Sequence, residues 1–200
     1  IPMFGIGGLT GLPLGLPLSD IPLHDTYYVI GHFHYVVAPG TIFAIFAGIY
    51  YWFPKMTGKP LNEILGKVHF IFSFIFMNLF FMPMFFQGLA GLSRRMVDGG
   101  TSYAHASGVI HYNEFMMYAS WGLAVAQLPF ILNIILTLLK KKDENPDPNP
   151  WQATTLEWVA APSPPIGHGN FPEAPVVYRG PYEYSVPGEE LDFSPQNKKD

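Results

Sequence analysis

Three long runs of hydrophobic residues dominate the chain, at about residues 26–53, 64–88 and 112–139. Each run is long enough to cross a bilayer as a helix, which takes about 20 residues. The first run contains no Lys, Arg, Asp or Glu, and each of the others carries a charge only near its start. Because helices of soluble proteins seldom stay apolar on all sides over such a length, the pattern predicts an all-α integral membrane bundle. Buried helices of a large soluble protein are the alternative.

Two segments of different character flank the hydrophobic runs. Residues 1–25 begin with the apolar stretch IPMFGIGGLTG, which predicts the end of a preceding helix followed by a loop. Residues 140–200 hold most of the charges and more than half of the prolines, so we expect an extended polar tail there. The chain opens inside an apolar segment without an initiator Met, and we therefore expect a fragment or one piece of a split subunit.

The distribution of lysines predicts how the helices are oriented. Lys55 and Lys59 lie between the first two runs, and three consecutive lysines at 140–142 follow the third. Loops rich in Lys and Arg stay on the cytoplasmic side of a membrane. We therefore expect the tail to be cytoplasmic and residues 1–25 to lie on the outer side.

The composition narrows the chemistry that the chain can support. Charged residues make up only 13% of the chain, which is about half the share in soluble proteins. The sequence has no Cys, which excludes disulfides and thiolate metal sites. A metal would therefore be bound by His, carboxylate, Met or Tyr side chains. The sequence shows no basic face, so we expect no nucleic-acid partner.

Two histidines, His32 and His34, lie inside the first hydrophobic run, within HDTYYVIGHFHYVV. An ionisable residue at such a position indicates a functional site. Successive helical residues are rotated by about 100°, so positions i and i+2 point about 200° apart. As ligands, the two rings would therefore serve two centres on opposite faces, with Phe33 between them. Neutral imidazole is a common ligand of haem iron. The alternative is that each ring hydrogen-bonds to a neighbouring helix.

Two polar groups near the predicted outer ends of the helices are further candidates. Asp20, His24 and Asp25 precede the first run and could bind Mg²⁺ together with water or another chain. A capping Asp beside a solvated His is the alternative. Arg94 and Arg95 lie on the side where positive charge is disfavoured, and paired guanidiniums bind carboxylates such as haem propionates. Lipid headgroups are the alternative partner.

The stretch SDIPLHDTYYVIGHFHYVVAPGTIFAIFAGIYYWFP resembles subunit I of the haem–copper oxidases. So do IFMNLFFMPMFFQGLAGLSRRMVD and, more loosely, the third run. The similarity extends over about residues 7–139, and the tail, with NPWQATTLEW and APSPP, is similar to that of bacterial members. The resemblance implies that the three runs are the last three of twelve transmembrane helices. It also implies two haems, for which the a type is favoured, together with copper and with Mg²⁺ or Mn²⁺.

The resemblance further implies roles for individual residues. His32 matches the axial ligand of the high-spin haem, where O₂ is reduced, and His34 matches an axial ligand of the low-spin haem. Phe33 lies on the short electron route between the two haems. His24 and Asp25 match the ligands of the Mg²⁺ or Mn²⁺ ion at the boundary with subunit II.

Three more residues match positions around the haem propionates. Asp20 matches a carboxylate near the propionates of the high-spin haem, in the proton exit region. Arg94 and Arg95 match the pair that holds the propionates. The copper ligands and the second ligand of the low-spin haem belong to earlier helices of the family and have no counterpart in this sequence. We therefore expect the chain to be inactive alone.

The function implied by the resemblance is that of the catalytic subunit of a respiratory cytochrome c oxidase in a bacterial inner membrane. Such a subunit reduces O₂ to water with electrons from cytochrome c and couples this reaction to proton pumping. Its partners would be the remainder of subunit I, subunits II and III, cytochrome c and membrane lipids. The alternatives are a quinol oxidase of the same superfamily, a non-catalytic dihaem electron-transfer subunit, and a transporter with a polar helix pair.

Overall fold

The computed structural model describes residues 1–141, 147–167, 171, 173–180 and 194–199. Lys142, one of the three lysines used to predict the orientation, and parts of the tail lie outside the described residues. Every regular element within the described ranges is a helix, and Thr26 and Ser93 form an isolated antiparallel bridge. The predicted all-α class is confirmed.

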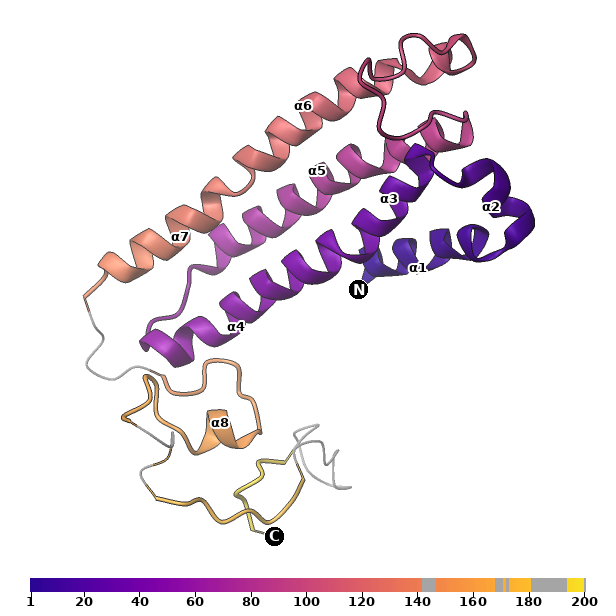
Figure 1. Ribbon diagram of the computed structural model, residues 1–200. Coiled ribbons are helices and arrows are strands. Elements are labelled where there is room, and N and C mark those ends of the chain that lie inside the picture. The colour runs from indigo at the N-terminus through magenta and orange to yellow at the C-terminus, as the bar shows by residue number, and fades with distance from the viewer. Residues whose placement is uncertain (142–146, 168–170, 172, 181–193, 200) are drawn as a thin grey trace. The chain divides into compact units, whose positions relative to one another are not determined.

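Three helices are long and apolar enough to span a membrane, and Figure 1 shows them as the long rods of the chain. They cover Tyr27–Thr57, Glu63–Leu89 and His111–Leu139. The prediction of three helices that are long and apolar enough to cross a membrane is therefore confirmed. In chain order, the elements of the spans are α3 (Tyr27–Val36), the π-helical turn η1 (Ala38–Phe43), α4 (Ala44–Thr57), α5 (Glu63–Leu89), α6 (His111–Val125) and α7 (Leu128–Leu139).

Local sequence explains where the first and third spans begin or are interrupted. Thr26 begins α3, because its side chain accepts a hydrogen bond from the Tyr28 N–H at 3.2 Å. Pro39 lies in η1, where its missing N–H and its ring disturb the α-helical hydrogen-bond pattern. Ala126 and Gln127 separate α6 from α7, and Pro129 lies in the first turn of α7, where a missing N–H costs least.

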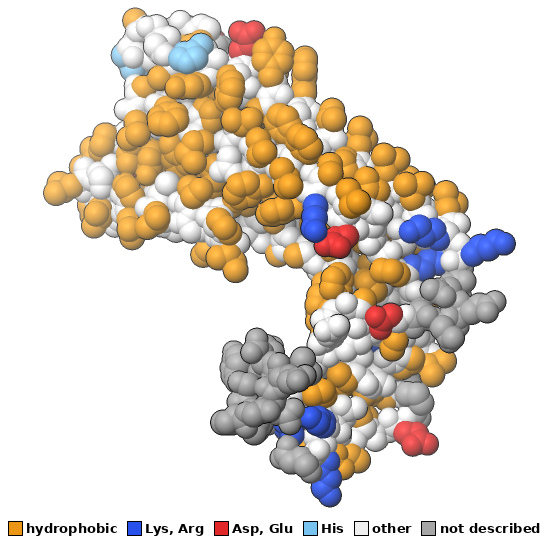
Figure 2. All heavy atoms as spheres, turned by 180° about the vertical axis from the view of Figure 1, so that it is seen from behind, with side chains coloured by type: hydrophobic (Ala, Val, Ile, Leu, Met, Phe, Trp, Pro, Cys, Tyr) orange, Lys and Arg blue, Asp and Glu red, His pale blue; other side chains and the backbone are white. Residues whose placement is uncertain are grey.

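The spans expose hydrophobic side chains over much of their surface. Figure 2 shows these side chains gathered on the long helices. Phe70, Trp121 and Leu136 are each more than half exposed, at 56%, 61% and 52%. A soluble monomer rarely exposes an apolar surface of this extent. The surface is therefore suited to contact with lipid tails or with further transmembrane helices.

One compact unit consists of residues 1–47 and 63–132, and α5 connects its other helices. α5 packs against both α3 and α6, and α1 (Pro2–Gly15) packs against α3 (Figure 1). α2 (Pro17–Leu23) leads from α1 to α3, and the 3₁₀ helix η2 (Ala104–Val109) lies in the loop between α5 and α6. The core consists of methionine and aromatic side chains together with one leucine, namely Met3, Leu23, Tyr28, Tyr35, Met77, Phe81, Met84, Phe85 and Met116.

Two glycines allow α5 to approach its neighbours closely. A Cβ added at Gly88 of α5 would lie 2.1 Å from the backbone nitrogen of Tyr28 in α3. A Cβ added at Gly122 of α6 would lie 2.2 Å from the ring of Phe76 in α5. Because Cβ atoms essentially never approach other heavy atoms within 3.0 Å, a side chain at Gly88 would require the α3 backbone to move, and one at Gly122 would require the Phe76 ring to move.

The second compact unit consists of residues 48–62 and 133–200. Within it, the tail packs on the end of α4 through a cluster of four aromatic side chains. Tyr51 stacks on Trp151, and Trp52 stacks on Trp158. The indole Nε1 of Trp151 also donates to the carbonyl oxygen of Tyr51 at 2.9 Å. The short helix α8 (Leu156–Val159) carries Trp158 into this cluster, while the rest of the described tail is irregular.

Lys55 is buried within this second unit by the tail. Its ammonium group donates to the carbonyl oxygen of Ala161 at 2.8 Å. It also lies 4.8 Å from the ring centre of Trp158, which is a cation–π arrangement. The tail therefore supplies the groups that surround a charge at the end of the first span.

We expect Gly88→Ala to destabilise the assembled protein by about 1–3 kcal/mol, since the backbone at Tyr28 would have to move. The measurement is the midpoint of thermal denaturation in detergent. Gly48→Ala in α4 is the matched control, because an added Cβ there has no neighbour within 4 Å. Alanine is the better helix former, so the control should unfold at the wild-type temperature or slightly above it. An unchanged midpoint for Gly88→Ala would contradict the close approach of α3 and α5.

Candidate functional site

The His32 ring lies against α1. Its Nδ1 is 2.9 Å from the carbonyl oxygen of Gly7 and 3.3 Å from the hydroxyl oxygen of Thr10. Gly11 lies one turn after Gly7, and a Cβ added at Gly11 would lie 2.8 Å from Cε1 of the His32 ring. Gly11 of α1 therefore leaves room for the ring, and the Gly7 carbonyl fixes the direction of its Nδ1.

The His34 ring contacts α5 instead of α1. It stacks on Phe81, with ring centres 4.5 Å apart and planes 19° apart. The ring of Phe33 lies 4.4 Å from the ring of His34, tilted by 30°. Nδ1 of His34 is 2.8 Å from the carbonyl oxygen of Ile30, one turn earlier in α3.

The two imidazoles share one hydrogen-bonding arrangement. In each, Nδ1 lies beside a backbone carbonyl, which favours the tautomer with the proton on Nδ1 and the lone pair on Nε2. None of the hydrogen bonds among the described residues reaches Nε2 of His32 or His34. Histidines that ligate metals typically donate their second ring N–H to a carbonyl or carboxylate in this way. The residues therefore fit two separate haem irons, which His32 and His34 would hold through Nε2.

A short antiparallel pairing brings the segment before α3 and the loop after α5 together. The Thr26–Ser93 bridge is extended by a hydrogen bond from the Arg94 N–H to the Asp25 carbonyl oxygen at 2.9 Å. This pairing places the Arg94 guanidinium beside the Asp25 carboxylate. Nε of Arg94 donates to Oδ1 of Asp25 at 2.8 Å, and Nη2 donates to the same oxygen. Asp25 and Arg94 thus form a charge-assisted pair that connects the start of α3 to the loop after α5.

His24 completes this charged group. Its Nε2 lies 3.0 Å from Oδ2 of Asp25, the oxygen that Arg94 does not contact. The hydrogen bond from Arg94 lowers the pKa of Asp25, and the charges of Arg94, His24 and Arg95 act in the same direction against desolvation. Asp25 is therefore ionised well below neutral pH.

The predicted Mg²⁺ or Mn²⁺ ligands are adjacent but incomplete. Within the described part of the chain, no three His, Cys, Asp or Glu residues lie close enough together to hold a metal ion. His24 and Asp25 therefore fit such an ion only as two ligands of a set that water or another chain completes. Asp20 lies one turn earlier, in α2, and its carbonyl oxygen accepts the His24 N–H at 2.6 Å.

Arg94 and Arg95 have different surroundings although they are neighbours in sequence. The Arg94 side chain is 23% exposed and paired with Asp25, whereas Arg95 is exposed and has a positive φ of 66°. The loop that follows is folded around Asp98. Hydrogen bonds from Ser102 and from the Gly100 N–H lower the pKa of the Asp98 carboxyl group, so this turn is held by an ionised side chain.

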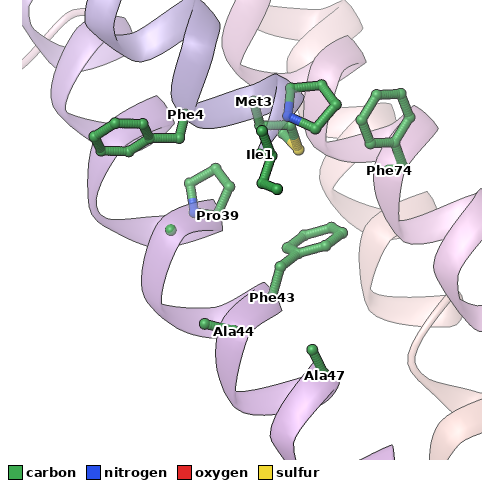
Figure 3. Close-up of a pocket in the computed structure, with 10 residues that line it drawn as sticks. Ile1, Met3, Phe4, Pro39, Phe43, Ala44, Ala47 and Phe74 are labelled. Atoms are coloured by element: carbon green, nitrogen blue, oxygen red, sulfur yellow. The ribbon is translucent and has the colours of Figure 1, made fainter. Parts of the chain in front are cut away.

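An apolar cavity of about 460 Å³ lies in the first compact unit, and Figure 3 shows its lining. The walls come from α1, η1, α4 and α5, through Ile1, Pro2, Met3, Phe4, Pro39, Gly40, Phe43, Ala44, Ala47 and Phe74. No ionisable side chain lines the cavity. It therefore offers space for a hydrophobic group but no acid–base chemistry.

Comparison with known proteins identifies the family that combines these features. Residues 1–125 match the family described as "Cytochrome C and Quinol oxidase polypeptide I". The chain is 46% identical over 189 residues to cytochrome c oxidase subunit 1 of Synechocystis sp., covering 94% of this chain and 32% of that protein. It is 42% identical over 193 residues to alternative cytochrome c oxidase subunit 1 of Bradyrhizobium diazoefficiens, covering 96% and 32%. The chain belongs to the subunit I family of the haem–copper oxidases.

A solved structure supports the same fold. A heme-copper terminal oxidase dimer determined by cryo-EM aligns with a TM-score of 0.61 at 25% identity, covering 72% of this chain and 26% of that chain. The resemblance read from the sequence is thus confirmed. The chain spans about a third of the length of the curated relatives it matches (32%).

Sequence reasoning missed the ion pair between Asp25 and Arg94. These residues lie 69 positions apart, and their contact depends on the antiparallel pairing around Thr26. The packing of α1 on His32 did have a signal in the sequence. Gly7 and Gly11 have the i, i+4 spacing that permits close helix approach in membranes.

We expect the stability contributed by Asp25 to depend on pH. The pKa of its carboxyl group is lower in the folded protein than in the unfolded chain, where Asp has a pKa of about 3.9. The contribution is therefore fully present above about pH 4 and is lost as the pH falls through the folded value. Thermal midpoints measured against pH should fall more steeply in the wild type than in Asp25→Asn. Glu114→Gln is the control and should follow the wild type; identical profiles for Asp25→Asn and wild type would contradict the pairing.

Proposed function

We propose that the chain is part of the catalytic subunit of a respiratory cytochrome c oxidase, which reduces O₂ to water with electrons from cytochrome c and pumps protons. The observation that carries this proposal is the pair of histidines on α3, whose rings contact different helices while each Nδ1 faces a backbone carbonyl. Two of the relatives bear the names cytochrome c oxidase subunit 1 and alternative cytochrome c oxidase subunit 1.

In this function, His32 holds the iron of the high-spin haem and His34 holds the iron of the low-spin haem. The haems and copper supply the redox chemistry by which O₂ accepts electrons. The contribution of the chain is to present each Nε2 as a neutral donor and to prevent ring rotation through the Nδ1 hydrogen bonds. Phe33 lies between the two ligands in sequence, and we assign it to the electron route.

The outer-side residues would serve the charged edges of the haems. Arg94 uses Nε and Nη2 on Asp25, which leaves further N–H donors of the guanidinium for a propionate. Arg95 is exposed, and we assign its guanidinium to a second propionate, to which its N–H groups would donate. We assign Asp20 to the proton exit region, and His24 and Asp25 to a Mg²⁺ or Mn²⁺ ion shared with subunit II.

The complete enzyme requires parts that this sequence lacks. We assign the copper ligands and the second ligand of the low-spin haem to the remainder of subunit I. Subunits II and III, cytochrome c and the lipids of a bacterial inner membrane are the other proposed partners. On this assignment, the isolated chain does not reduce O₂.

A quinol oxidase is the second candidate, because the matching family description names both electron donors. Measuring O₂ uptake by the complete complex with reduced cytochrome c and with a quinol decides between the two donors. Absence of O₂ uptake with either donor, in a complex that retains both haems, would instead favour a dihaem electron-transfer subunit.

The first prediction from this function separates the two histidines. His34→Ala should remove most of the low-spin haem absorbance while CO still binds the high-spin haem, and His32→Ala should do the reverse. Optical spectra of the reduced complex, with and without CO, make the measurement. His105→Ala, an exposed position outside α3, is the control. The same spectral loss from both α3 variants would rule out two separate centres.

The second prediction concerns the arginine pair. Each charge-assisted bond to a propionate is worth on the order of 1.5–3 kcal/mol, and loss of a nearby positive charge favours the oxidised haem. Arg94→Ala and Arg95→Ala should therefore lower haem reduction potentials in spectroelectrochemical titration, and Arg→Lys should lower them less. Asp25→Asn removes a negative charge from the same group and should shift the potential upward. Unchanged potentials in both Arg→Ala variants would favour lipid headgroups as the partners.

The third prediction concerns orientation, which rests on the lysines at the ends of the spans. The 200 residues contain no Cys, so in a complex whose remaining sequences are also free of Cys a single introduced thiol reports its own position. We place Cys at the exposed positions Val97, in the loop after α5, and Glu173, in the tail. In intact cells a membrane-impermeant thiol reagent should label Val97→Cys, and it should label Glu173→Cys only after the inner membrane is opened. Labelling of Glu173→Cys in intact cells would reverse the proposed topology.

A further inference from the structure

Tyr35, the residue after His34, carries a polar group that the proposed function does not use. Its side chain is fully buried, at 0% exposed, and its hydroxyl donates to Oδ1 of Asn78 in α5 at 2.9 Å. The Asn78 amide is held in turn, because its Nδ2 donates to the carbonyl oxygen of Phe74 at 2.7 Å. Inside a bilayer no water can replace this bond. The pair therefore joins α3 and α5 in one particular geometry.

The Tyr35 ring and the His34 ring share a neighbour on α5. Tyr35 packs edge-on against Phe81 at 6.5 Å, and His34 stacks on the same ring at 4.5 Å. Consecutive helical residues differ in direction by about 100°, so Tyr35 and His34 face α5 on either side of Phe81. A rotation of α3 about its axis would move both side chains, and the Tyr35–Asn78 bond opposes that rotation.

A second hydrogen bond, between His32 and α1, restricts the rotation of α3 from another side. The Gly7 carbonyl of α1 contacts Nδ1 of His32 at 2.9 Å. Within α3, His32 therefore has an anchor on α1, whereas the Nδ1 contact of His34 lies inside its own helix, at Ile30. The direction of the His34 ring consequently depends on how α3 is set against α5, and Tyr35 is the hydrogen-bonding residue beside it that contacts α5.

We propose that Tyr35 is a positioning residue: through Asn78 it sets the rotation of α3, and thereby the orientation in which His34 meets the low-spin haem. This inference rests on the proposed function of His34. The Tyr35–Asn78 pair is suited to fixing the position of α3 and not to proton transfer, because the amide of Asn78 is not a base. The ring of Tyr35 also packs on Phe85 at 5.7 Å, so phenylalanine would keep the packing and lose only the bond.

The test is Tyr35→Phe in the complete oxidase complex. Low-temperature EPR of the oxidised low-spin haem reports the orientation of its axial imidazoles, and spectroelectrochemistry reports its potential. We expect both haems to be retained in wild-type amounts, with shifted low-spin g-values and a shifted low-spin potential. Tyr118→Phe is the matched control, since it also loses a hydroxyl bond, to Glu114, but on the exposed surface of α6. The control should reproduce the wild-type values.

A double variant separates positioning from stability. Tyr35→Phe leaves the Asn78 amide without its donor, whereas Tyr35→Phe/Asn78→Leu makes both partners apolar, and such replacement can be nearly neutral for stability. We expect the double variant to regain thermal stability yet keep the shifted g-values. It therefore tests the positioning role of Tyr35 even if the single variant does not assemble. Wild-type g-values in the double variant would overturn the proposal.

The ligand role of His34 and the positioning role of Tyr35 predict different results. If His34→Ala retained the low-spin haem signal, the ligand assignment itself would be wrong. If His34→Ala lost that signal while both Tyr35 variants kept wild-type g-values, only the positioning role would be wrong.

Discussion

The hydrocarbon interior of a membrane offers no water, so each polar group inside the three spans has to be satisfied by the protein. Hydrogen bonds within the described residues satisfy several of these groups, whereas Oε1 of Gln87 and the hydroxyl of Thr137 are buried without a partner. His69 of α5 lies 3.1 Å from Oε1 of Gln127, whose Nε2 donates to Ser73 at 3.1 Å. Asn133 of α7 is fully buried and contacts both the N–H and the carbonyl oxygen of Asn62 at 2.8 Å. These hydrogen bonds fix how neighbouring segments are aligned along the helix axes.

The candidate ligands depend on the same constraint. His32 and His34 are polar residues on an apolar helix, and the carbonyls beside their Nδ1 atoms satisfy one nitrogen of each ring. The arrangement leaves the other nitrogen for a metal without requiring a further protein contact. Close packing brings α1 and α5 to the two rings, through Gly11 on one side and Phe81 on the other. The orientation of the two imidazole rings therefore depends on how α1 and α5 pack against α3.

Much of this arrangement follows from the sequence, and some of it does not. The three spans were predictable because hydrophobic length is a local property, and the spacing of His32 and His34 already implies different directions on a helix. The pairing of Asp25 with Arg94 was not predictable, because it joins distant segments and uses positive φ angles at Asp25 and Arg95. Such backbone conformations are rare for residues other than glycine and leave little trace in the sequence.

The position of the Tyr35 bond illustrates the same limit. A tyrosine in an apolar helix signals that a partner exists, but the partner could lie on any neighbouring helix. Only the packing of α3 on α5 selects Asn78. Local patterns thus identify the residues that need a contact, and the fold decides which contact they receive.

The burial of Lys55 has a consequence for biosynthesis. The carbonyl that receives its ammonium belongs to Ala161, 106 residues later in the chain. While the ribosome is still making the third span, the end of the first span therefore carries a cation and exposed aromatic rings whose final neighbours do not yet exist. A nascent chain released before Trp158 would keep that surface open to solvent and to quality-control proteases. The end of this helix therefore reaches its final surroundings only after residue 161 has been synthesised.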